Sequence, residues 1–141
     1  MPLGIHDCEL SEIEAVFAHN RQRKKIWQGF LAFLDLVRPI SELNVIYIDG
    51  GFVTDNSHPN DVDIIIEYPD GATRQRLRED HWFLRLRSKV LDKHLVDVLG
   101  CLLNEPSPNM IEFFQFLRID DAVKRGLPAG ARKGILKTTL R

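Results

Sequence analysis

The sequence has few cysteines, no long apolar run and no excess of charge of either sign. Its two cysteines, Cys8 and Cys101, are too few for a secreted disulfide framework and lack metal-ligand spacing. No apolar stretch approaches the roughly 18 residues that span a membrane, and the first residues show no signal peptide. These absences predict a reduced, cytoplasmic protein with no membrane segment.

The charge balance limits the possible partners. Lys and Arg number 19 and Asp and Glu 20, which gives a net charge of −1 over 141 residues. Proteins that grip duplex DNA usually carry a strong positive excess, so this balance disfavours that class but allows a local basic groove. The five histidines lack metal-binding spacing, and no serine or cysteine lies in a nucleophile motif, so covalent hydrolysis is unsupported.

The hydrophobic pattern predicts a mixed α/β (α+β) fold, a small mixed sheet flanked by helices, in a single domain over residues 1–141. Residues 1–10 are expected to form a leading arm. Ser11 and Glu14 form a capping-box pattern before a long helical stretch that breaks near residues 19–20 and ends at Pro39. Strands are expected at residues 44–49, 61–67, 94–100 and 134–140, and further helices at residues 73–90 and from Ser107.

The residues best suited to chemistry lie between the first two of these strands. One strand runs into Gly50 and Gly51, and nine residues later Asp61 and Asp63 begin the next strand. Alternate strand residues point to one face, so the two carboxylates project side by side and repel each other unless a cation neutralises them. Hard divalent cations such as Mg²⁺ bind carboxylates together with substrate phosphates, and glycines let backbone amides approach an anion.

Asp97 is a third acidic candidate, because a charge inside an otherwise apolar strand is costly unless it is paired or bound to metal. Three carboxylates from two strands, facing a glycine turn, could form a two-metal phosphoryl-transfer site. More ordinary explanations stand beside this one. Gly-Gly and Asp-x-Asp are common turn chemistry, and Asp97 could pair with one of the arginines in residues 74–87.

The pattern at Gly50–Gly51 and Asp61-x-Asp63 resembles the signature of the nucleotidyltransferase superfamily. In that family a Gly-Ser pair precedes Asp-x-Asp at a similar spacing, and a third acid lies on a later strand. The longer resemblance is to minimal nucleotidyltransferase-like bacterial proteins of toxin–antitoxin and phage-defence modules, and it rests on residues 47–54, 59–63 and 133–135.

The resemblance implies an enzyme that uses Mg²⁺ (or Mn²⁺) to move a nucleoside monophosphate from an NTP to a hydroxyl of protein or RNA. It implies that Asp61, Asp63 and Asp97 bind the metal, with Asp97 as ligand or base, and that Gly50 and Gly51 hold the nucleotide phosphates. Gly51 stands where the family has serine. That departure leaves open a catalytically silent binding protein of the same fold, a toxin–antitoxin or defence partner. A partner protein or a second copy of the chain would hold any large substrate.

Basic residues are further candidates. The group Arg21, Arg23, Lys24 and Lys25 and the arginine-rich segment 74–89 could contact phosphate or nucleic acid, although a solvated helix face is the ordinary explanation. Two single residues are further candidates: Lys133 could contact phosphate or form part of an interface, and His58, in the loop that leads to the carboxylates, could approach a bound substrate.

Overall fold

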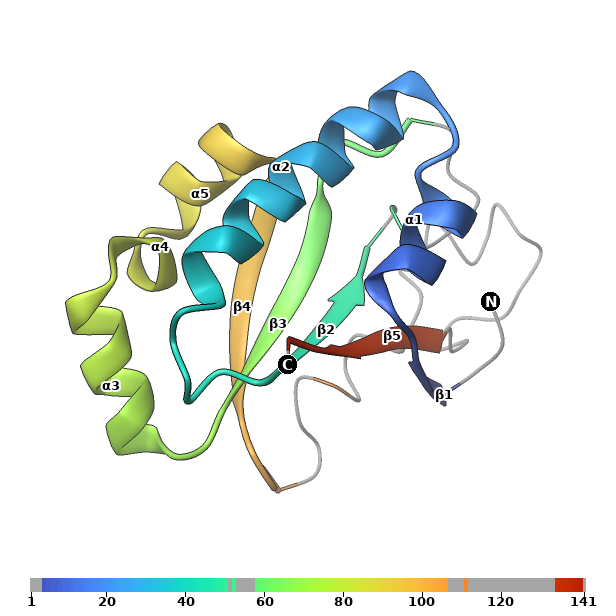
Figure 1. The fold of residues 1–141 in the computed structure, drawn as a ribbon. Coiled ribbons are helices and arrows are strands. Elements are labelled where there is room, and N and C mark those ends of the chain that lie inside the picture. The colour runs from blue at the N-terminus through green and yellow to red at the C-terminus, as the bar shows by residue number, and fades with distance from the viewer. Residues whose placement is uncertain (1–3, 51, 53–57, 107–110, 112–133, 141) are drawn as a thin grey trace, which may run out of the picture.

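A computed structural model describes residues 4–50, 52, 58–106, 111 and 134–140. Within them, five helices and one five-stranded sheet form a mixed α/β fold, which confirms the expected fold class (Figure 1). The strands are β1 (Gly4–Asp7), β2 (Val45–Asp49), β3 (Val62–Tyr68), β4 (Val96–Leu102) and β5 (Gly134–Thr139). The helices are α1 (Leu10–Phe17), α2 (Arg21–Val37), α3 (Gly71–Asp80), α4 (Trp82–Arg85) and α5 (Arg87–His94).

The order of the strands across the sheet is β1-β5-β2-β3-β4. β2 runs antiparallel to β5 and β3, whereas β3 pairs with β4, and β1 with β5, in parallel. The end of β2 therefore lies beside the starts of β3 and β4. β1 occupies part of the expected leading arm, so residues 4–7 belong to the sheet itself.

The main core lies between one face of the sheet and the helices. The apolar stripe of α2 is buried there, as its spacing predicts, against isoleucines of β2 and β3. A smaller cluster lies on the other face and contains Tyr47, Ile65, Cys101 and Ile135, with Ile111 packed against it. Successive residues of β3 fall in both clusters, which confirms the prediction that this strand is buried on both faces.

The helix break near residues 19–20 is confirmed, but the predicted start of the first helix is wrong. The Asn20 side chain accepts a hydrogen bond from the Arg23 amide at 2.8 Å and so caps α2. At α1, the Glu12 carboxylate accepts from the Glu9 amide at 3.1 Å, so capping falls two residues before the predicted Ser11. The side chains of Glu9 and Glu12 form the capping box in place of those of Ser11 and Glu14.

The helical structure predicted over residues 73–90 is confirmed, but it is divided into three helices and does not form one continuous helix. The breaks fall at His81, whose backbone is extended, and at Leu86, whose backbone leaves the helical region, so that α3, α4 and α5 follow one another. The short helix between these breaks buries Phe83 and Leu84. The next strand begins two residues later than predicted, since Leu95 ends α5 in the left-handed conformation with φ 58°.

The last predicted strand is confirmed as β5, whereas the helix expected from Ser107 falls outside the described residues except for Ile111. None of the helices in the described part of the chain is long and apolar enough to cross a membrane.

Candidate functional site: an acidic row at one end of the sheet

Three aspartates form a row across β2, β3 and β4. In the pairing of the strands, Asp49 is the partner of Asp63, and Asp63 is the partner of Asp97. Paired residues on neighbouring strands share a face, and such strands lie about 4.8 Å apart. Because strand residues alternate, this face is the one opposite Ile48 and Ile64, which point into the main core. We call Asp49, Asp63 and Asp97 the acidic row.

The structure brings together two of the three predicted acids directly. Asp63 and Asp97 are side by side and half-buried, and Asp61 lies just before β3, two residues from Asp63. Asp49 is the acid that the sequence analysis did not select. It is only 1% exposed, although it ends an apolar strand. An aspartate at the end of an apolar strand can be noticed in the sequence, but its pairing with Asp63 depends on the register between β2 and β3.

Gly50 brings the backbone of the turn against the carboxylate of Asp63. Its φ is +85°, a left-handed conformation that favours glycine. A Cβ added to Gly50 would lie 2.7 Å from Asp63 Oδ2 and 3.0 Å from Asp63 Cγ. The glycine turn and the Asp-x-Asp pair therefore meet in space, which their spacing predicts. Gly51, the second predicted phosphate contact, lies outside the described residues.

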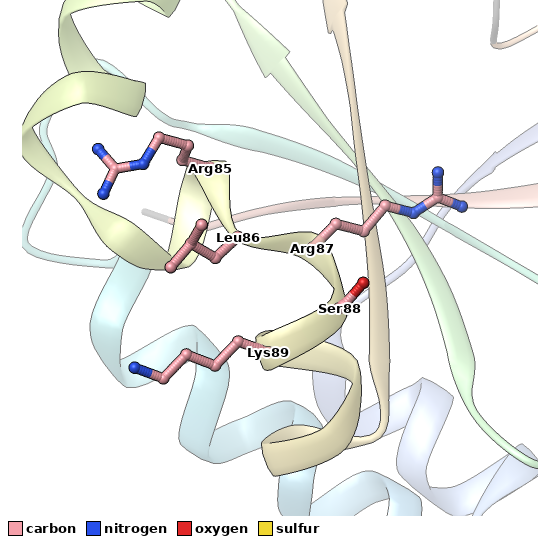
Figure 2. Close-up of a pocket in the computed structure, with 5 residues that line it drawn as sticks. All are labelled: Arg85, Leu86, Arg87, Ser88 and Lys89. Carbon is pink, nitrogen blue, oxygen red and sulfur yellow. The ribbon is translucent and has the colours of Figure 1, made fainter.

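Arg87, the first residue of α5, forms a bidentate ion pair with Asp97. Its Nε donates to Oδ1 at 2.5 Å and its Nη2 to Oδ2 at 2.9 Å. This confirms the alternative that Asp97 pairs with an arginine of residues 74–87. The hydrogen bond to Asp97 raises the pKa of Arg87 above its usual value, and the negative charges of Asp97 and Asp63 raise it further. Figure 2 shows the Arg87 side chain extending past β4, away from those of Arg85 and Lys89.

The first turn of α2 holds both sides of the connection between β2 and β3. Arg23 is fully buried, and its Nη1 donates to the carbonyls of Phe17, at 3.1 Å, and Phe52. Gln22 Nε2 donates to the carbonyl of Pro59 at 2.9 Å. Arg23 is therefore neither part of a solvated helix face nor available to contact nucleic acid, the two roles considered for its basic group. Its guanidinium anchors the backbone carbonyl of Phe52.

Phe52 is a second anchor of the same connection. Its side chain is fully buried, and its ring stacks on Trp27 with centroids 6.0 Å apart and planes 9° from parallel. The Arg23 guanidinium lies 5.4 Å from the centroid of the Phe52 ring. Phe52, two positions after Gly50, is therefore fixed against α2.

The donor chemistry of Asp63 and Asp97 fits a hard divalent cation, since Mg²⁺ commonly takes one or two carboxylates together with substrate phosphates. The absence of a side chain at Gly50 lets the backbone of the turn approach the Asp63 carboxylate more closely than a Cβ would allow. No three His, Cys, Asp or Glu side chains among the described residues are grouped so that they could hold a metal ion. In this arrangement Arg87 supplies the counter-charge for Asp97.

The only cysteine of the smaller cluster on this face is not suited to nucleophilic chemistry. Cys101 is buried, and burial raises the pKa of its thiol to about 12, with Glu67 and Glu105 adding to the shift. The thiolate is therefore scarce at neutral pH. The absence of a cysteine nucleophile motif in the sequence agrees with this chemistry.

Fold and site together define a mixed α/β protein with an acidic row at one end of its sheet. The chain belongs to DUF6932, a family of unknown function whose model matches residues 1–139. Comparisons with curated proteins and with solved structures gave no match. The family covers every described element but assigns no activity, so the function has to be argued from the acidic row and its neighbours.

Proposed function

We propose that this protein is a Mg²⁺-dependent nucleotidyltransferase, which moves a nucleoside monophosphate from an NTP to a hydroxyl of protein or RNA. The observation that carries the proposal is the pairing of Asp63 with Asp97, with the Gly50 turn packed against Asp63. Carboxylates beside a glycine turn supply the two halves of a phosphoryl-transfer site, one for cations and one for phosphate.

In the proposed reaction, Asp63 and Asp97 would hold the cation, whereas Asp61, two residues before Asp63, is not grouped with both of them as the third ligand that the sequence predicts. Bound there, Mg²⁺ would neutralise phosphate charge and acidify the attacking hydroxyl. That hydroxyl oxygen forms a bond to the α-phosphorus, and the bond from this phosphorus to pyrophosphate breaks. Asp97 accepts the proton, and the Gly50 turn brings backbone amides close to the phosphates.

The test is transfer from a labelled NTP with Asp63→Asn and Asp97→Asn, and with the double variant Asp61→Ala/Asp63→Ala. We expect each to lower transfer by at least ~100-fold, because the carboxylates act on charge that develops in the reaction. Asp92→Asn is the matched control, since Asp92 is exposed on α5. Circular dichroism checks the fold of each variant. Unchanged transfer in the double variant would sink the assignment.

The second candidate is a catalytically silent protein of the same fold, a toxin–antitoxin or defence partner that binds a protein or another copy of itself. Two observations favour it: Arg87 already engages both oxygens of Asp97, and Gly51 replaces the expected serine. Calorimetry with NTP and Mg²⁺ separates the candidates. Heat of binding that disappears in Asp63→Asn favours the enzyme, whereas no binding at millimolar ligand favours the silent partner.

A further inference from the structure

The ion pair of Arg87 and Asp97 lies next to a second carboxylate. Asp63 is the strand partner of Asp97, and its negative charge acts on Arg87. The guanidinium of Arg87 therefore binds one of two neighbouring carboxylates directly and feels the charge of the other. A divalent cation matches both charges, and it needs oxygens of Asp97 that the guanidinium now occupies. The two cations therefore compete for the same carboxylate.

The Arg87 side chain is accessible to a second partner. Its side chain is 57% exposed, against 20% for Asp97. It also lines an open hollow of about 460 Å³, together with Arg85, Leu86, Ser88 and Lys89 (Figure 2). A guanidinium binds the oxygens of phosphate with the same two-pronged geometry that it uses for carboxylate.

The other two cations of the hollow are engaged elsewhere. Arg85 Nη1 donates to the carbonyls of Arg78 and Glu79, at 3.3 and 3.1 Å, which places its guanidinium at the end of α3. Lys89 Nζ lies 4.8 Å from the centroid of the Trp82 ring. Among the described residues that line the hollow, Arg87 is the basic side chain that forms an ion pair with the acidic row.

We propose that Arg87 is a phosphate-binding residue of this site, which holds Asp97 until a divalent cation takes the carboxylate and then binds the triphosphate. This inference rests on the proposed function, and it adds the basic residue that the Gly-Gly and Asp-x-Asp pattern lacks. Arg87 should therefore have opposite effects on two affinities. It lowers the affinity for the cation when no nucleotide is present, because it competes for Asp97. It raises the affinity for the nucleotide that binds together with the cation.

The experiment has two parts. Electron paramagnetic resonance measures the binding of Mn²⁺ alone. Calorimetry then measures the binding of a non-hydrolysable ATP analogue in the presence of Mn²⁺. For Arg87→Gln we expect Mn²⁺ alone to bind about tenfold more tightly, because a charge-assisted pair no longer competes. The analogue with Mn²⁺ should bind about tenfold more weakly, since a charged hydrogen bond to phosphate is lost. Arg85→Gln, which removes the same charge from the same hollow, is the matched control and should change either affinity less than about twofold.

The outcomes separate this inference from the proposed function. If Mn²⁺ and the analogue bind the wild type, and Asp63→Asn abolishes binding while Arg87→Gln changes neither affinity, the proposed function stands and the role of Arg87 is overturned. Equal effects of Arg85→Gln and Arg87→Gln also overturn it, because the effect is then one of general charge. If neither the wild type nor Arg87→Gln binds Mn²⁺, both the proposed function and the role of Arg87 are wrong.

Discussion

Replacement of Gly50 by alanine tests the close approach of the turn to the acidic row. The substitution places a Cβ 2.7 Å from Asp63 Oδ2 at a residue whose φ is +85°. The left-handed conformation costs an alanine about 1–2 kcal/mol, and overpacking against Asp63 costs about 1–3 kcal/mol. The lower entropy of the unfolded chain offsets roughly 0.4–1 kcal/mol of this. We expect a net loss of about 2 kcal/mol.

A loss of that size lowers the melting temperature by about 7 °C for a chain of this length. Urea unfolding followed by circular dichroism measures the free energy directly. Gly71→Ala is the matched control, because an added Cβ at Gly71 has nothing within 4 Å. That control should leave stability unchanged or raise it by up to ~1 kcal/mol.

A double-mutant cycle with Asp63→Ala then isolates the contact. In the Asp63→Ala background the carboxylate is absent, so Gly50→Ala should cost only the conformational part of the loss, about 1 kcal/mol. An equal cost of Gly50→Ala in both backgrounds would refute the contact between the turn and Asp63. A stabilising Gly50→Ala would refute the left-handed turn as well.

Three further substitutions or conditions test the packing around the site. Gly29→Ala should lower the free energy of unfolding in urea by about 1–3 kcal/mol, because the added Cβ would lie 2.1 Å from the carbonyl oxygen of His94. This loss is expected although alanine favours an isolated helix over glycine. Arg23→Met should cost about 2–3 kcal/mol by removing charged hydrogen bonds, one of them to Phe52, whereas exposed Lys24→Met should change stability by less than ~0.5 kcal/mol. Burial lowers the pKa of His94, so the unfolded chain binds the proton more readily and stability should fall as pH decreases below about 6.5.

Each of these expectations has a clear contrary result. A more stable Gly29→Ala variant would show that α2 does not lie against the end of α5. Equal losses for the Arg23 and Lys24 variants would show that the buried guanidinium makes no specific contacts. For the pH dependence, thermal melts from pH 7.5 to 5 are compared with those of His94→Gln, which should show a smaller decrease. The same decrease in both proteins would assign it to other groups.

The sequence by itself determined the local features of this protein. The apolar stripe of α2, the break capped by Asn20 and the apolar strands β2 and β3 follow from patterns within short segments. The meeting of Gly50 with Asp63 also agrees with the sequence, which places a glycine turn at the end of one strand and the acids at the start of the next. Boundaries were less predictable: the three helices between β3 and β4 depend on Phe83 and Leu84, which turn inward to reach the core.

Only the tertiary structure decided which charges meet. Asp49 joins the acidic row through the register of β2 with β3, and Asp97 joins it through the register of β3 with β4. Arg87 is the first residue of α5, after the helical segment is broken at Leu86, and its side chain reaches Asp97 near the start of β4. Sequence patterns report the environment of each residue in its own segment. Strand register and helix placement arise from contacts between distant segments, and these selected Arg87 from among many arginines as the partner of Asp97.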